Sequence, residues 1–441
     1  VHYNDILKVL SQDALRICFS YSLQTLSGET LIPSSLYKQI QYMFSLKEEP
    51  KAQFYAMDDF YQLGGESSDK PILNKNIHQY LNCKNQPEKL SKDITDSLYS
   101  SHLSVSQIET YNKCPFAYFI QYGLNIYPHR DNQLMPNELG SLVHYVLSIC
   151  IDQDQDINQL VEDYIRQDDL LSVKIQSSSI NLYFIEQLKK DLHITIQIAR
   201  RQISLSHFRV LSKEEKITDE IKGINFKGFV DRIDQCEEKI SIIDYKSSDK
   251  DIDLNLAMQG FNIQMLLYLK MVTRQYHKDP AAVLYFNTKK RVLSLKQSLK
   301  DDIDDNEFYK QYRYGGYVFD DDSHSSILAL DPQMDKKSNI VNISYVKTKN
   351  EYKGHLLTPQ QLNVLLKIIE DHIYELYTHI IDGDISISPK GSDQSATHTV
   401  VNPCRYCPYH SVCSFDVFYN DYQLVQFLDV DQMLGGDEDA I

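Results

Sequence analysis

The stretches GFVDRID at residues 228–234 and IIDYK at residues 242–246 decide the fold of this chain. They predict two antiparallel strands, 224–234 and 239–246, which can be joined by a two-residue hairpin turn at Glu237-Glu238. In such a hairpin the turn fixes the register, so it also fixes which side chains face each other across the two strands.

This register places Asp231 directly opposite Asp244, with Cβ atoms about 5 Å apart. Two facing carboxylates repel each other unless a cation lies between them. Lys246 is two residues beyond Asp244 and therefore points to the same face of the sheet. Two acids and an amine on one face favour a site for a hard divalent cation with a lysine beside it. The alternative is an exposed hairpin with scattered charges.

Composition limits the class of protein. The 441 residues include 45 Lys and Arg against 61 Asp and Glu, so the formal charge is −16, which argues against a bulk phosphate-binding surface. An apolar content of 42% fits a packed globular protein of two or three domains. No apolar run approaches the ~18 residues of a membrane span. No P-loop is present, so we expect no ATP hydrolysis by this chain.

Hydrophobic periodicity and capping residues predict the other elements. Ser106, with Glu109 three residues later, is the expected cap of one helix, and Asn137 is the expected cap of another. In chain order we expect a strand at 15–21 and helices at 36–43, 106–111, 116–122 and 138–151, then long helices across 157–204, a helix at 254–275, a strand at 281–286 and a helix at 359–381.

Three of the eight cysteines are clustered, in the pattern Cys404-x2-Cys407-x5-Cys413. The chain begins at Val1 without an export signal, so a cytoplasmic location is expected, a disulfide framework is not, and the clustered thiols indicate a metal. The missing initiator Met suggests a fragment. We interpret four other cysteines as structural thiols: Cys18, Cys83, Cys150 and Cys236.

The paired strands resemble the core of the PD-(D/E)XK nuclease superfamily, which carries an Asp on one strand and a D-x-K triplet on the next. GSLVH at 140–144 resembles the helical G-x-x-x-H motif of the RecB-like branch, and QMLLY at 264–268 resembles its Q-x-x-x-Y motif. DYKSS at 244–248 is similar to the form found in bacterial recombination nucleases. The resemblance implies an α/β restriction-endonuclease-like fold, with a central mixed sheet flanked by helices, long helical insertions and an iron–sulfur staple.

The resemblance also implies roles for individual residues. The family's metal ligands correspond to His144, Asp231, Asp244 and the main-chain carbonyl of Tyr245, and this oxygen-rich set suits Mg²⁺ or Mn²⁺. Lys246 would orient the attacking water or stabilise charge on the phosphate, and Gln264 and Tyr268 would position the lysine, the water or the DNA. Either Glu214 or Glu215 would add a further oxygen, and their spacing does not choose between them.

An early cysteine, Cys114 in the run CPFAYF, together with Cys404, Cys407 and Cys413, resembles the iron–sulfur staple of AddB/RexB-type nuclease subunits. The resemblance implies a [4Fe–4S] cluster, although spacing alone also allows a four-cysteine zinc site. It further implies an AddA/RexA-type helicase partner, single-stranded DNA fed from an unwound duplex, cleavage of the strand ending 5′ at the break, and a role in recombinational repair.

The expected organisation has four parts: residues 1–70 as the end of a helicase-like domain, 71–103 as a connector, 104–427 as the nuclease domain and 428–441 as an acidic, disordered tail. One alternative function is a stand-alone iron–sulfur exonuclease of the CRISPR-adaptation type, which would lack the segment before the nuclease. The other is an inactive DNA-binding scaffold, which would lack the metal ligands.

Overall fold

The computed structural model describes residues 35–43, 85–99, 102–128, 134–288, 311–321, 323–391, 402–416 and 420–435. The chain divides into two compact units, Val1–Cys83 and Lys84–Ile441. In the first unit, helix α2 (Ser35–Met43) agrees with the helix expected at 36–43, whereas the strand expected at 15–21 lies outside the described residues.

The second unit is built around a seven-stranded mixed sheet in the order β1-β3-β4-β5-β6-β9, with β2 paired to β3. Pairs β2–β3, β3–β4 and β5–β6 are antiparallel, and pairs β1–β3, β4–β5 and β6–β9 are parallel. The strands are β1 (His102–Ser104), β2 (Arg209–Ile221), β3 (Ile224–Cys236), β4 (Lys239–Lys246), β5 (Asp279–Asn287), β6 (Gly315–Phe319) and β9 (Leu356–Leu357). Two smaller ladders pair β7 (Ile343–Val346) with β8 (Glu351–Gly354), and β10 (Lys390–Gly391) with β11 (Gln423–Leu424).

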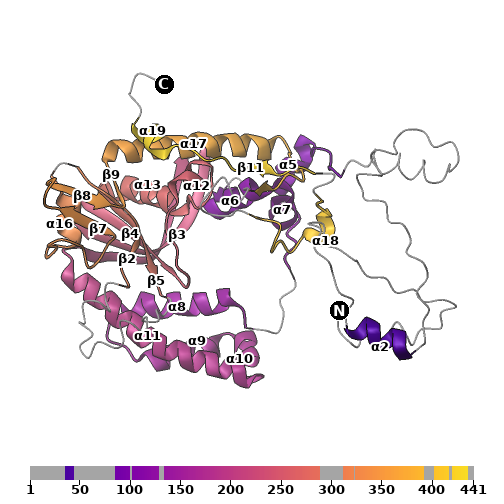
Figure 1. Ribbon diagram of the computed structural model, residues 1–441, viewed down its shortest axis with the longest axis horizontal. Coiled ribbons are helices and arrows are strands. Elements are labelled where there is room, and N and C mark those ends of the chain that lie inside the picture. Colours follow the sequence, from indigo (N-terminus) through magenta and orange to yellow (C-terminus); the bar gives the residue numbers. More distant parts are fainter. Residues whose placement is uncertain are drawn as a thin grey trace. The chain divides into compact units, whose positions relative to one another are not determined.

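Helices cover both faces of this sheet, so apolar side chains on alternate strand positions are buried on either side (Figure 1). One core lies under α6 (Val105–Lys113), α12 (Leu254–Met258), α13 (Gln264–Tyr276) and α17 (Pro359–Ile381). The other lies under α8 (Pro136–Cys150), α9 (Ile157–Gln167), α10 (Asp169–Gln176) and α11 (Ser179–Leu205). Shorter helices are α5 (Lys92–Leu98), α7 (Pro115–Tyr118), η1 (Phe119–Gly123), α16 (Ser325–Leu330), α18 (His410–Cys413) and α19 (Val430–Gly435). Within the described residues, no helix is both long enough and apolar enough to cross a bilayer.

The central hairpin has the predicted register. Arg232 pairs with Ile243 and Cys236 pairs with Lys239, so Glu237 and Glu238 form the two-residue turn. The ladder stops at Arg232, one residue before Asp231. Beyond this point β3 stays paired with β2 but no longer with β4. The Asp231 side chain can therefore accept a hydrogen bond from the β4 main chain.

Several expected boundaries were wrong by a few residues. Ser104 caps α6 in place of Ser106, and its partner in the capping box is Gln107. Helix α8 begins at Pro136 after the N-cap residue Met135, so Asn137 lies inside the helix. The helix expected at 254–275 is two helices, because residues 259–263 break it. At α6 the two serines offer similar capping chemistry, so the sequence alone does not choose between them.

The two ends of the nuclease region also differ from expectation. Helix α5 lies in the expected connector but belongs to the second unit. The tail was expected to be disordered from residue 428, yet residues 430–435 form α19, whose Leu434 is buried in the core beneath α17. The apolar side chain overrides the acidic composition of this segment, because its burial stabilises the helix.

Candidate metal centre and thiol pocket

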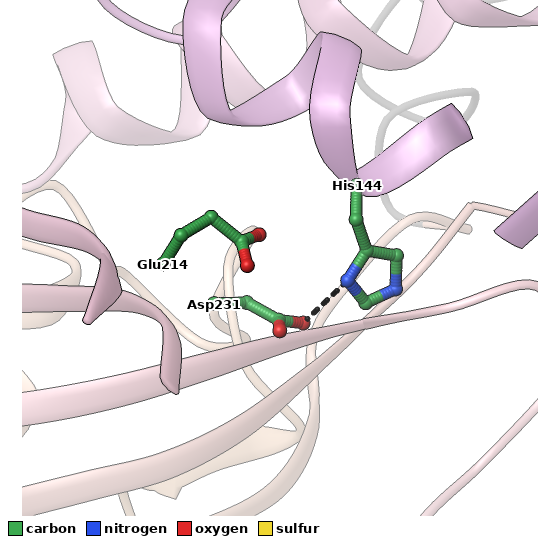
Figure 2. A group of neighbouring side chains, drawn as sticks. All are labelled: His144, Glu214 and Asp231. Atoms are coloured by element: carbon green, nitrogen blue, oxygen red, sulfur yellow. Dashed lines mark ion pairs between the residues drawn. The ribbon is translucent and has the colours of Figure 1, made fainter. Parts of the chain in front are cut away.

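His144, Glu214 and Asp231 form a group that has the geometry of a metal site. One ligand atom from each lies within 4.8 Å of the others. Figure 2 shows His144 reaching down from α8 towards the two carboxylates, which come from the paired strands β2 and β3. The site therefore lies where α8 crosses the sheet.

The predicted ligand atoms of Asp231, His144 and Tyr245 are in direct contact. The Tyr245 N–H donates to Oδ2 of Asp231 at 2.8 Å, which replaces the ladder bond that is missing at this position. The same Oδ2 atom lies 3.2 Å from Nδ1 of His144. The other ring nitrogen, Nε2, lies 2.9 Å from the Tyr245 carbonyl oxygen. Helix α8 thus brings His144 to two ligands of the central hairpin, 101 residues before Tyr245 in the sequence.

The charges around His144 favour a cation at this point. Burial alone would lower the pKa of His144, but the hydrogen bond to Asp231 and the negative charges of Asp231, Asp244 and Glu214 raise it above its usual value. Both ring nitrogens therefore face oxygen acceptors in a negative environment. A nitrogen, carboxylate oxygens and a carbonyl form a donor set that fits a hard divalent cation better than a soft one.

Asp244 and Lys246 stand next to this group rather than within it. The Lys246 ammonium lies 2.6 Å from Oδ2 of Asp244. Burial and the charge of Asp231 raise the pKa of Asp244, although Lys246 acts in the opposite direction. The charge of Asp231 therefore acts on Asp244 as expected from their facing positions, and the Lys246 ammonium opposes it.

Glu214, and not Glu215, faces the site. Glu215 accepts hydrogen bonds from the Tyr276 hydroxyl and the Gln275 amide, each at 2.7 Å. Glu214 has a φ of 48°, a left-handed conformation that is strained for a non-glycine residue and is often found at functional sites. Burial and the charge of Asp231 raise the pKa of its carboxyl group.

A signal in the sequence could have selected Glu214. Lys222 and Gly223 both have positive φ and form the two-residue turn between β2 and β3. The pairs on either side of Glu214 are Lys213 with Arg232 and Glu215 with Val230, so Glu214 lies opposite Asp231. The register argument used for the second hairpin would have given this result for the first.

Gln264 and Tyr268 lie one turn apart on α13, as their spacing predicts, and the Gln264 amide donates to the Tyr268 hydroxyl at 3.2 Å. The Tyr268 ring lies on β3 at Gly228, where an added Cβ would come within 2.4 Å of it. Gly228 is therefore needed for close approach, a role that the sequence did not reveal.

A cleft of about 460 Å³ opens beside the metal group. His144 and Glu214 line it together with one side of α8. The other lining residues are Asn137, Gly140, Ser141, Tyr145 and Ser148. A substrate in this cleft would reach the ligand atoms of both His144 and Glu214.

The four cysteines of the expected cluster line a second cavity, of about 400 Å³. Cys114 stands at the junction of α6 and α7, Cys404 and Cys407 lie on the loop before α18, and Cys413 is the last residue of α18. Burial raises the pKa of the Cys114 thiol to about 11, although the N–H groups of Ala117 and Phe116 donate to its sulfur. Thiols are the donors of zinc and iron–sulfur sites, but among the described residues only His144, Glu214 and Asp231 bring three ligand atoms within 4.8 Å of one another, so the four sulfurs share a cavity without lying at the spacing of a single-ion site.

The remaining cysteines do not belong to this group. Cys150 and Cys236 are not among the residues that line the cavity, and the structural role predicted for them is unchanged. Cys18 and Cys83 lie outside the described residues.

Hydrogen bonds also close the chain around the thiol cavity. The Asn85 amide donates to Oδ1 of Asn420 at 3.0 Å, and the Asn420 amide donates back to the Asn85 carbonyl at 2.9 Å. The Tyr409 hydroxyl donates to the Ile126 carbonyl at 2.9 Å. The beginning and the end of the second unit are thus joined by main-chain and amide contacts as well as by the thiol pocket.

Comparison with known proteins gives a consistent result. The sequence profile of the PD-(D/E)XK nuclease superfamily matches residues 102–414. An ATP-dependent helicase/deoxyribonuclease subunit from Clostridium acetobutylicum is 28% identical over 83% of this chain and 35% of its own length. The subunit of the same name from Oceanobacillus iheyensis is 26% identical over 96% of this chain and 42% of its own length.

The chain spans well under half the length of these curated relatives. Among solved structures, that of a candidate exonuclease from Eubacterium rectale is 16% identical and aligns with 46% of this chain and 75% of its own, with a TM-score of 0.29. The superfamily profile covers well over half of the chain, including both strands of the central hairpin. The chain belongs to the PD-(D/E)XK nuclease superfamily.

Proposed function

We propose that this chain is the nuclease region of a helicase–nuclease protein and that it hydrolyses phosphodiester bonds of single-stranded DNA. The observation that carries the proposal is the convergence of His144, Asp231 and the Tyr245 carbonyl beside an open cleft, with the Asp244–Lys246 pair next to them. The relatives named as helicase/deoxyribonuclease subunits support a DNA substrate.

The residues at the centre would hold Mg²⁺ or Mn²⁺. His144, Asp231, Glu214 and the Tyr245 carbonyl offer donor atoms close together, and Asp244 adds a carboxylate from the next strand. When bound, such an ion would polarise the scissile phosphate and lower the pKa of the attacking water.

Other side chains would supply orientation and charge. The Lys246 ammonium, held by Asp244, is available to orient a water or to stabilise negative charge that develops on the phosphate. Tyr268 lies over Gly228, close to the strand that carries Asp231, and it holds the Gln264 amide. We assign this pair to the positioning of Lys246 and the DNA.

The thiol pocket would hold a [4Fe–4S] cluster through Cys114, Cys404, Cys407 and Cys413. The four side chains line one cavity, and main-chain N–H groups already donate to the Cys114 sulfur, as they do to thiolate ligands in many clusters. The proposed role is structural, because the pocket joins residues about 290 positions apart.

The biological setting follows from the resemblance and the relatives' names. We propose an AddA/RexA-type helicase partner, which would feed an unwound strand into the cleft, and cleavage of the strand that ends 5′ at a double-strand break. The process would be end resection for recombinational repair.

The test uses single-stranded oligonucleotides labelled at either end. With Mg²⁺ or Mn²⁺ we expect metal-dependent cleavage, which excess EDTA stops reversibly because hard oxygen sites exchange their ion readily. Label position and product length show the polarity of cleavage. Absence of cleavage by the purified chain, both alone and with its partner, would overturn the proposal, and full turnover with Ca²⁺ would overturn the proposed ligand set.

A further inference from the structure

Helix α13, which carries Gln264 and Tyr268, takes its N-terminal cap from another helix. Its own N-cap residue, Ile263, makes no side-chain cap hydrogen bond. The N–H groups of Ile263 and Gln264 both donate to Oε1 of Glu109, at 2.8 Å and 3.2 Å. The first N–H groups of a helix lack partners within it, so one carboxylate oxygen on α6 satisfies two of them.

A second residue of α6 holds the segment just before α13. The Asn112 amide donates to the Gln259 carbonyl at 2.8 Å. Gly260 follows with a φ of +81°, and a Cβ there would lie 2.6 Å from the His372 ring and 2.9 Å from the Asn112 amide. Residues 259–263, which break the expected long helix, are therefore fixed by α6 at both ends.

The side chains of Gln264 and Tyr268 meet at β3, within reach of the charge of Asp244 beside the metal centre. Gln264 donates to the Tyr268 hydroxyl, which also accepts a hydrogen bond from the Phe229 N–H of β3. Burial raises the pKa of Tyr268, and the negative charge of Asp244 is close enough to raise it further. A shift of this turn would move both side chains relative to β3. The position of the first turn of α13 therefore sets where the proposed catalytic side chains Gln264 and Tyr268 lie.

The other end of α6 enters the thiol pocket. Cys114 is its C-cap residue, and the Cys114 N–H donates to the Thr110 carbonyl at 3.0 Å. Thr110 and Lys113 line the pocket as well. One nine-residue helix thus contacts the thiol pocket at its end and the start of α13 through Glu109.

We propose that Glu109 is a positioning residue for Gln264 and Tyr268, and that α6 couples the structure of the thiol pocket to the structure of the nuclease site. The inference rests on the proposed function. Glu109 touches neither substrate nor metal ligand in this scheme. It acts by keeping the first turn of α13 in place.

The central experiment compares Glu109→Ala with Glu109→Gln in the full chain. The alanine removes the acceptor, so we expect kcat for single-stranded DNA cleavage to fall about tenfold or more, as happens when supporting groups of an active site are lost, with KM changed less than about twofold. The glutamine keeps an oxygen that can accept both N–H groups, so it should recover most of kcat. Thr358→Ala removes the N-cap of α17 and serves as a matched control for loss of helix capping.

A second measurement does not depend on activity. Hydrogen exchange of the segment 259–264 should speed up in Glu109→Ala but not in Glu109→Gln or Thr358→Ala. If α6 couples the structure of the thiol pocket to the start of α13, Cys114→Ser should speed up hydrogen exchange in the same segment.

The outcomes separate this inference from the proposed function. A wild-type chain that does not cleave DNA contradicts the function, and the exchange data then decide whether Glu109 holds α13. Wild-type cleavage matched by an equally active Glu109→Ala overturns the positioning role alone. A kcat loss in Thr358→Ala as large as in Glu109→Ala would also overturn it, because the effect would then be general destabilisation.

Discussion

The metal centre and the thiol pocket are assembled in different ways. The metal centre is built from strands that are hydrogen-bonded neighbours, with His144 added from α8 above them. The thiol pocket joins Cys114 to residues about 290 positions later, where the two ends of the unit meet. The first site depends on local register and the second on closure of a long loop. Damage to the first should therefore affect chemistry, whereas damage to the second should affect stability.

The largest expected effect is the loss of catalysis in Asp244→Asn. We expect cleavage to fall by at least about a thousandfold, since both the proposed metal ligation and the Lys246 pairing depend on this carboxylate. The metal-free protein should not lose thermal stability. Burial and Asp231 raise the pKa of Asp244, so its charge is disfavoured in the folded state and its removal costs little.

Glu238→Gln in the turn of the same hairpin is the matched control, and it should retain cleavage. Turnover and thermal unfolding would be measured on both variants. An active Asp244→Asn would contradict the assignment of the site. A large drop in its melting temperature would remove the contrast with the thiol pocket.

The next effect concerns stability. Cys407→Ser should lose iron and the broad absorbance near ~400 nm, and it should unfold at a lower temperature. On a chain-entropy model, a cross-link over about 290 residues contributes roughly 5 kcal/mol. The loss should be smaller than this, because the Asn85–Asn420 and Tyr409–Ile126 hydrogen bonds already hold the ends together.

Cys236→Ser is the control for the thiol pocket, since Cys236 is not among its lining residues. It should keep iron and stability. Stoichiometric zinc in a colourless protein would replace the iron–sulfur assignment but leave the closure argument intact. A Cys407→Ser variant as stable as the wild type would refute the closure itself.

These two regions also differ in how far the sequence predicts them. The register of the central hairpin could be calculated from its turn, so Asp231, Asp244 and Lys246 could be placed before the structure was known. Spacing groups Cys404, Cys407 and Cys413, but Cys114 could be added to them only by family resemblance, because nothing local links it to Cys404. Hydrogen bonds such as Glu109 to Ile263, 154 residues apart, leave no periodic pattern and could not be predicted.

A smaller effect should sharpen the description of the metal centre. Glu214→Gln should weaken Mg²⁺ activation about tenfold, because Glu214 faces Asp231 and His144. Glu215→Gln should change it little, because Glu215, the next residue of β2, accepts a hydrogen bond from the Tyr276 hydroxyl of α13 and does not join the metal group. Cleavage rates measured over a Mg²⁺ series test both variants. Equal effects would mean that the strained backbone at Glu214 serves the fold and not the metal.

The smallest effect lies near the thiol pocket, at Lys390. Burial lowers the pKa of Lys390 to about 8, and the charge of Glu375 opposes this only in part. Its ammonium donates to Oδ1 of Asn112 at 2.6 Å and lies 3.5 Å from Nε2 of His372. Below pH 8 the lysine is charged in both the folded and unfolded states, so the full cost of burying the charge is present. As pH rises from about 8 towards the unfolded value of 10.5, the folded state releases its proton first and the cost disappears.

Lys390→Met keeps the apolar stem and removes this charge. At pH 7 it should be more stable than the wild type by about 1 kcal/mol, less than the pKa shift alone implies, because the hydrogen bond to Asn112 is also lost. The advantage should shrink as pH rises through 8 towards 10, as measured by denaturant unfolding at each pH.

Burial also lowers the pKa of His372, so it titrates below this window and should not obscure the trend. The exposed Lys367→Met is the control and should show no such trend. An advantage of Lys390→Met that stays constant with pH would mean that the buried charge is not its source. Packing around Asn112, rather than removal of the lysine charge, would then stabilise the variant.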